Sequence, residues 1–195
     1  MGSMEGFLLK IRWVLMHPFD FFKQRYRETQ IKESVLYVVT LTLLSSMLSS
    51  LLTILVSGTQ LSLLRKFFYV RLPLPGTASV KLAMLTVSYS IVLIVFFFLV
   101  AFALKIWMHI FGVQSSYSKT FQLMAYSLTP VYLFGWISEN VSFATWIWAL
   151  ILLVVGSRGM FEVSKRKSWL MFTLPAVVFV VGRIVVGLWV ARIVG

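Results

Sequence analysis

Long apolar segments separated by short polar ones dominate the chain. They run from about Val35 to Val56, Leu82 to Trp107, Phe121 to Ile137, Val141 to Gly156 and Trp169 to Ile193. A helix needs about 20 mainly apolar residues to cross the roughly 30 Å hydrocarbon core of a bilayer. The pattern therefore predicts an all-α fold, a polytopic transmembrane helical bundle of five spans over residues 35–195.

The residues before the first span follow another pattern. Within residues 4–16, Phe7, Ile11 and Val14 fall on one helical face. A helix of this length is too short to span. It either lies in the membrane interface or packs on the bundle as a first helix, and the pattern favours neither. Pro18 ends it, because the residue before a proline is pushed out of the helical region.

Residues 18–33 mix aromatic rings with basic side chains. Aromatic rings at headgroup depth beside Lys and Arg are typical of a cytoplasmic interfacial anchor. We therefore expect residues 1–34 to be a cytoplasmic interfacial segment, of which 1–3 are a cloning remnant. Generic anchoring is favoured over a specific acidic-lipid site. The residues expected to contact lipid are Phe19, Phe21, Phe22, Lys23, Arg25 and Arg27.

Composition agrees with an integral membrane protein. Of the 195 residues, 59% are apolar and 12% are charged, whereas a soluble domain has about 45–50% apolar and about 25% charged residues. The net charge of +12 lies in short segments beside the apolar runs, so it indicates orientation in a membrane and not nucleic-acid binding. A cytoplasmic N-terminus and an outside C-terminus place twelve of the 18 Lys and Arg inside and five outside, which predicts that orientation.

The third span is organised around a proline. Pro130 lacks a backbone N–H and frees the carbonyl four residues earlier, that of Tyr126. In lipid, this carbonyl needs a partner from a neighbouring helix. The third span is therefore expected inside the bundle, with the other spans around it.

Arg183 is the one full charge placed deep inside a span. Burying such a charge in hydrocarbon costs at least about 2.5–3.5 kcal/mol, and no span holds a carboxylate to pair with it. A structural role, with the guanidinium donating to proline-freed carbonyls or reaching the interface, is favoured over a polar cavity that attracts an anion or a lipid headgroup. The residues expected to form that cavity are Arg183, Tyr126, Ser127, Thr129, Pro130, Ser46, Ser49 and Ser88.

Hydroxyl side chains also recur along the first span. Thr42, Ser46, Ser49 and Thr53 are spaced by four, three and four residues, which places them on one helical face. Small hydroxyl residues let two helices approach closely and hydrogen-bond to each other. Helix packing is therefore favoured over a polar conduit along this stripe.

Catalytic chemistry is not expected. The chain has no cysteine, its six acidic residues lie outside the spans, and its two histidines are far apart in the sequence. An intramembrane enzyme would need an activated nucleophile, paired carboxylates or a metal-binding cluster within the bilayer. We therefore predict no catalytic residue, no cofactor and no metal site.

Three segments resemble the Yip family, the five-span membrane proteins named for interacting with Ypt and Rab GTPases. PFDFF at 18–22 resembles the start before the family's first span, SYSKTFQLMAYSLTP at 116–130 its lead-in to a third span, and WIWALILLVVGSRGMFEVSKRKSWLMFTLP at 146–175 its fourth and fifth spans. The resemblance covers 18–193 and implies five spans. Eukaryotic members carry a longer N-terminal region with an Asp-Leu-Tyr-Gly-Pro segment that this chain lacks, which argues against GTPase binding and for a prokaryotic relative.

Two functions from different classes follow. The first is a non-enzymatic, Yip-like scaffold or adaptor that binds membrane lipids, other membrane proteins or a second copy of itself. The resemblance implies the cell membrane for a prokaryotic chain, and trafficking in ER or Golgi membranes for a eukaryotic one. The second is a conduit for a small solute, an ion or a lipid through the polar cavity. Tight packing of the polar residues favours the scaffold, and an open groove favours the conduit.

Overall fold

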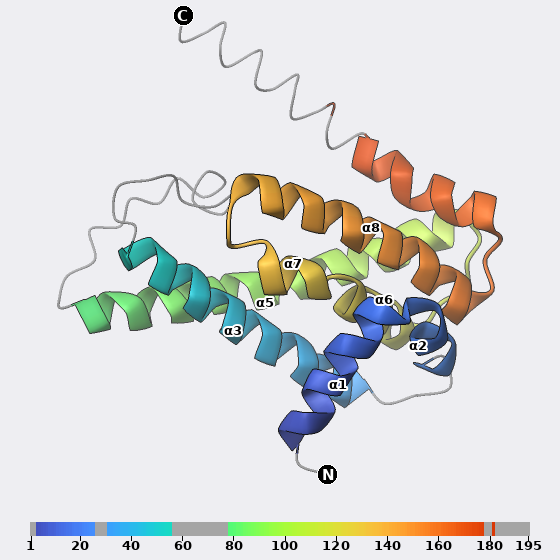
Figure 1. The fold of residues 1–195 in the computed structure, drawn as a ribbon. Coiled ribbons are helices and arrows are strands. Elements are labelled where there is room, and N and C mark those ends of the chain that lie inside the picture. Colours follow the sequence, from blue (N-terminus) through green and yellow to red (C-terminus); the bar gives the residue numbers. More distant parts are fainter. Residues whose placement is uncertain (1–2, 26–30, 56–77, 178–180, 182–195) are drawn as a thin grey trace, which may run out of the picture.

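The computed structural model describes residues 3–25, 31–55, 78–177 and 181, and every regular element among them is a helix. The labelled helices are α1 Ser3–Met16, α2 Pro18–Arg25, α3 Ile31–Leu55, α5 Ala78–Ile110, α6 Tyr117–Ser127, α7 Thr129–Phe134 and α8 Glu139–Phe161, and residues 165–177 are helical as well. Figure 1 shows α3, α5 and α8 running along the molecule, with α6 and α7 among them. The predicted all-α class is confirmed.

Three of these helices are long and apolar enough to cross a membrane. The qualifying stretches are Ile31–Leu52, Thr86–Ile110 and Asn140–Phe161. They correspond to the first, second and fourth predicted spans. The fifth predicted span, 169–193, lies partly outside the described residues. Five spans and the sidedness of the two termini therefore stay predictions.

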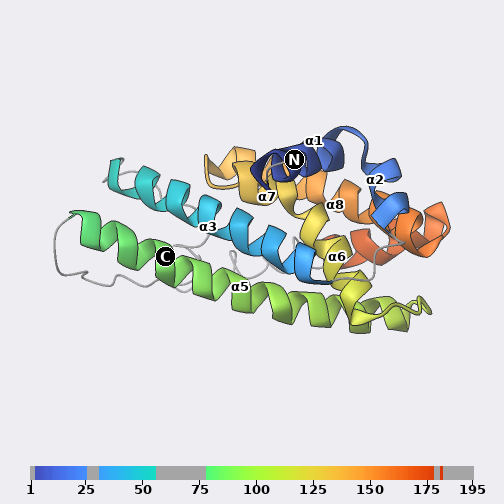
Figure 2. The same ribbon diagram turned by 90° about the horizontal axis from the view of Figure 1, so that it is seen from below.

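Helices α3 and α5 run antiparallel and side by side, as the two views in Figures 1 and 2 agree. Toward the core, α3 turns Tyr37, Val38 and Leu41, and α5 turns Phe97 and Ala101, all of them nearly inaccessible. Helix α3 also packs on α6 and α7. The pair therefore forms one wall against which the broken segment α6–α7 is held.

The third predicted span is a broken helix. Helix α6 begins where Ser116 Oγ accepts a hydrogen bond from the Lys119 N–H at 3.3 Å, and it ends at Leu128. Helix α7 then restarts with Pro130 in its first turn, where the missing N–H has no intrahelical partner to lose. Every residue from 120 to 130 is buried, which confirms the interior position expected for this segment.

Helix α8 extends past the predicted end of the fourth span. Gly156 was predicted to be the last residue of the span, yet the helix continues to Phe161 and ends at Glu162, whose φ of 53° is left-handed. Because Gly156 has no side chain, neighbouring side chains can approach α8 closely at this position. A Cβ at this position would lie 2.5 Å from Leu123 Cδ1 and 3.0 Å from Phe22 Cζ. Helices α6 and α2 thus reach α8 where it lacks a side chain.

The N-terminal helices α1 and α2 pack against α7 and α8 (Figure 2). Pro18 ends α1 as predicted, but it also begins α2, because proline suits a first helical position and Asp20 in the first turn complements the helix dipole. Helix α1 buries Val14 fully and leaves Leu8 and Met16 exposed. It therefore packs on the bundle and keeps one apolar face outward.

Candidate functional site

Tyr126 of α6 lies at the centre of a buried cluster. Its side chain is fully buried, and its hydrogen-bonded neighbours come from α3 and from the start of α7. Its ring meets the ring of Phe21 from α2 nearly edge-on, with centroids 4.8 Å apart, and that of Tyr37 from α3 at 5.0 Å. Helices α2, α3, α6 and α7 thus meet at one side chain.

The carbonyl of Tyr126 finds its partner within its own segment. Thr129 Oγ1 donates to it at 2.6 Å. A threonine hydroxyl carries a single hydrogen, so the Tyr37 hydroxyl, 2.9 Å from Thr129 Oγ1, must be the donor in that second bond. The expectation of a partner from a neighbouring helix is corrected on this point. Helix α3 supports the carbonyl through the bond of Tyr37 to Thr129.

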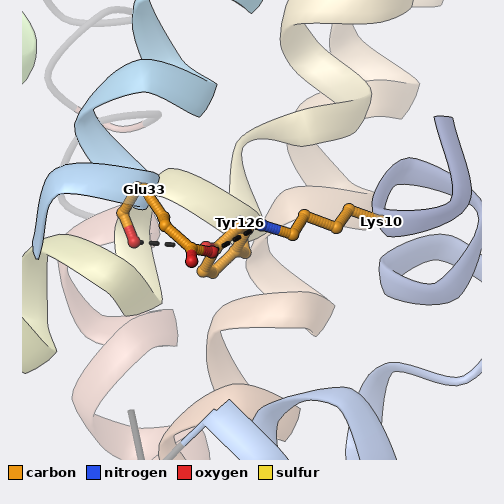
Figure 3. A network of polar contacts seen from close by, with 4 residues as sticks. Lys10, Glu33 and Tyr126 are labelled. Atoms are coloured by element: carbon orange, nitrogen blue, oxygen red, sulfur yellow. Dashed lines mark hydrogen bonds and ion pairs between the residues drawn. The ribbon is translucent and has the colours of Figure 1, made fainter. Parts of the chain in front are cut away.

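The hydroxyl of Tyr126 faces the junction between α1 and α3. Ser34 Oγ of α3 donates to it at 3.2 Å. The preceding residue, Glu33, accepts from Lys10 Nζ of α1 at 2.6 Å. Figure 3 shows Lys10 extending to Glu33 beside the Tyr126 ring. Both members of the pair are partly exposed, so the pair joins α1 to α3 with a small contribution to stability.

Phe21 and Phe22 were expected to contact lipid, but both are fully buried. A Cβ on Gly156 or on Gly159 of α8 would lie 3.0 to 3.2 Å from atoms of Phe22. The two glycines let α2 lie directly on α8, which removes both rings from the membrane interface. Of the other residues expected to contact lipid, Phe19 and Lys23 are exposed, and Arg27 and the side chain of Arg25 lie outside the described residues.

Most residues of the predicted polar cavity are buried in the part of the chain that the structure describes. Ser46, Tyr126, Ser127, Thr129 and Pro130 are buried, Ser49 is half-buried, Ser88 is exposed, and Arg183 lies outside the described residues. Ser88 is therefore no part of an interior site. Helix α5 instead turns Ser90 inward, where its hydroxyl donates to the Thr86 carbonyl at 2.7 Å.

Sequence reasoning missed several buried polar residues of α3. Ser34, Tyr37 and Ser50 are all nearly inaccessible. The hydroxyls of Ser46 and Ser50 have no hydrogen-bond partner among the described residues. The available signal was the spacing of Thr42, Ser46 and Ser50 by four residues, with Ser34 eight residues before Thr42, because residues four apart share one face of a helix. The predicted stripe instead continued from Ser46 to Ser49, which is only half-buried.

The buried groups of the site suit packing and hydrogen bonding. No three His, Cys, Asp or Glu side chains gather as a metal site would require, within the part of the chain that the structure describes. The cluster offers hydroxyls and aromatic rings. Such groups hydrogen-bond and pack, but a hydroxyl becomes a nucleophile only beside a base or a metal. Chemically, this arrangement fixes helices relative to one another.

Comparison with known proteins gives one match. The family model described as the Yip1 domain matches residues 13–187. The matched range includes α2 to α8 and every residue of the Tyr126 cluster except Lys10. No curated protein and no solved structure matches the chain.

Proposed function

Because the chain belongs to the Yip family, an integral membrane family not known for enzymes, we propose that it is a non-enzymatic scaffold or adaptor. It would hold other membrane proteins, or a second copy of itself, at defined positions in the bilayer. Lipids would be its remaining contacts. GTPase binding is not part of the proposal.

The packing of the polar residues is the observation that carries this proposal. Tyr37, Tyr126 and Thr129 are bonded to one another and at most a few per cent exposed. A conduit needs polar groups that face a continuous opening, where they replace the water shell of the solute. Groups that satisfy one another hold helices in place instead. The arrangement therefore favours a rigid scaffold over a conduit.

Helix α5 supplies the surface on which a partner would lie. Exposed apolar side chains recur at helical spacing over its whole length, at Val87, Ile91, Val95, Leu99, Phe102, Ile106 and Ile110. The helix uses its other face to pack on α3 and α6. In a bilayer, lipid tails or a second transmembrane helix would cover the exposed face. Either one keeps the apolar surface of α5 away from water.

Photocrosslinking in native membranes tests the scaffold. A photoreactive phenylalanine analogue would replace Val95, Leu99 or Phe102 on the exposed face of α5, and Trp146 on α8 would be the exposed control position. A scaffold predicts discrete protein adducts from a subset of the α5 positions, because a partner helix covers a strip of the surface. Lipid adducts alone, equal at all four positions, would contradict it.

Flux from liposomes tests the alternative. The purified chain, and separately Arg183→Ala, would be reconstituted in vesicles loaded with ions or small solutes, and scrambling of labelled lipid would be followed in parallel. The scaffold predicts release no faster than from empty vesicles. Release that Arg183→Ala abolishes would replace the scaffold by a conduit.

A further inference from the structure

Two turns form a pocket at the end of the bundle where α5 and α8 both finish (Figure 1). The first turn joins α5 to α6 and contains Gly112 at a φ of 68°, and the second follows α8 and contains Glu162 at 53°. Each turn is anchored by a buried valine, Val113 in the first and Val163 in the second. The pocket between them has a volume of about 630 Å³.

Positive charge enters this pocket from both sides. Lys119 of α6 and Lys167 of the helical residues 165–177 line it. Lys167 crosses the gap, because its Nζ lies 3.8 Å from the place that a Cβ on Gly112 would take. Glu162 also lines the pocket. Burial lowers the pKa of Lys119, so its ammonium has already lost part of its water.

The pocket lies at the depth of lipid headgroups. The stretches of α5 and α8 that can span a membrane end at Ile110 and Phe161. Phe161 itself lines the pocket, and Ile110 lies two residues before the lining residue Gly112. Ile106 and Ile110 are exposed beside it, and Trp107 and Phe111 pair with ring centroids 5.1 Å apart. Aromatic rings are enriched at this depth of a bilayer. An acyl chain could therefore lie along α5 while its headgroup occupies the pocket.

We propose that this basic pocket binds the phosphate group of an anionic membrane lipid, with Lys119 and Lys167 as the cationic ligands. Ammonium groups donate charge-assisted hydrogen bonds to phosphate oxygens. Gln114 and Ser116 line the same pocket and supply neutral donors. The apolar surface next to the pocket distinguishes a lipid phosphate from a soluble one. This site is independent of the scaffold role and of the N-terminal aromatic segment.

Native mass spectrometry of the detergent-purified full chain tests the site. The protein would be mixed with phosphatidic acid, with phosphatidylcholine or with inorganic phosphate. The site variant is Lys119→Gln with Lys167→Gln. Its matched control is Lys165→Gln with Arg166→Gln, which removes the same charge from exposed neighbours that do not line the pocket.

The wild type and the control should retain phosphatidic acid in preference to phosphatidylcholine, and the site variant should bind it about tenfold more weakly or worse. Equal losses in both double variants would overturn the site, because net charge alone would then explain retention. No preference for phosphatidic acid would overturn it too. Retention of inorganic phosphate as strong as that of the lipid would overturn the lipid assignment.

A labelling experiment tests the same proposal in case the lysine variant does not fold. The chain has no cysteine, so Ser164→Cys places a single thiol in the pocket lining, and Asn140→Cys places one at the far end of α8. Phosphatidic acid in nanodiscs should slow maleimide labelling at residue 164 severalfold relative to phosphatidylcholine, and leave residue 140 unchanged. Equal labelling at residue 164 in both lipids would overturn the proposal.

Discussion

In a water-soluble protein, apolar segments are buried and polar segments are exposed. Helix α5 and the segment from Thr120 to Pro130 show the opposite arrangement. Helix α5 is the longest apolar stretch, yet large side chains such as Phe96 and Leu99 are more than half exposed. The segment 120–130 contains Gln122 and several hydroxyl side chains, and all of it is buried. Lipid tails are as apolar as leucine, so apolarity does not drive a helix inward there. Polar and small side chains mark the interior of this protein.

The largest test of this difference removes one phenylalanine from each region. Phe121→Ala in α6 should lower the free energy of unfolding by about 3 kcal/mol, the low end for a buried phenylalanine, because lipid replaces water as the reference for its packing. Phe96→Ala on the exposed face of α5 should change it by less than about 0.5 kcal/mol. Unfolding in mixed detergent micelles measures both. Equal losses would mean that a partner or a second copy covers α5 in the sample.

A substitution of intermediate size fills the contact between α8 and its neighbours. Gly156→Val places a side chain where Leu123 and Phe22 leave no room, and such overpacking should cost about 1–3 kcal/mol. Gly6→Ala is the control, because a Cβ there meets nothing within 4 Å and alanine should stabilise the helix by about 0.5–1 kcal/mol. Thermal denaturation in detergent measures both. A stable Gly156→Val protein would show that α2 does not lie on α8.

A smaller effect is expected from the hydrogen bonds of the cluster. Thr129→Val removes the donor to the Tyr126 carbonyl and the acceptor for Tyr37, and should cost about 1–3 kcal/mol because buried polar groups lose their partners. Tyr37→Phe removes one of these bonds and should cost about 1 kcal/mol. The double variant should cost less than the sum of the two. Strict additivity would show that the two side chains do not interact.

The smallest effect is expected at the ion pair between α1 and α3. Lys10→Gln should cost between about 0 and 1 kcal/mol, since both partners are partly exposed to solvent. The loss should shrink when unfolding is repeated at about 1 M salt, where screening acts over about 3 Å. Glu33→Gln serves as the reciprocal variant. A loss above about 2 kcal/mol that salt leaves unchanged would place this pair in the interior.

The sequence was sufficient for the features that depend on one segment at a time. Apolar run length predicted helices at the three stretches that can span a membrane among the described residues, and the proline of the third run predicted its burial. The family match confirms the resemblance drawn from the motifs around Pro18, Lys119 and Gly156. These predictions succeed because length, helix breaking and charge are local properties.

Features that depend on two segments could not be predicted in the same way. Gly156 was predicted to end a span, and only the positions of Leu123 and Phe22 show that it is a contact inside a helix. The aromatic residues of α2 looked like an interfacial anchor because rings beside basic residues are common there, yet Phe21 packs on Tyr126. Ser88 and Ser90 are both polar, and the rotation of α5 against α3 decides which one is buried.

The break at Leu128 has a consequence for how the chain is made. The ribosome delivers α3 before α6 and α8 after it, at about 5–20 residues per second. Ser34 and Tyr37 are therefore present when Tyr126 emerges, while the glycine surface of α8 follows some seconds later. If α3 packs with α6 and α7 as they emerge, the hydroxyl contacts among them form while the face of α6 that packs on α8 is still uncovered. An insertase that shields that face would meet its client during this interval.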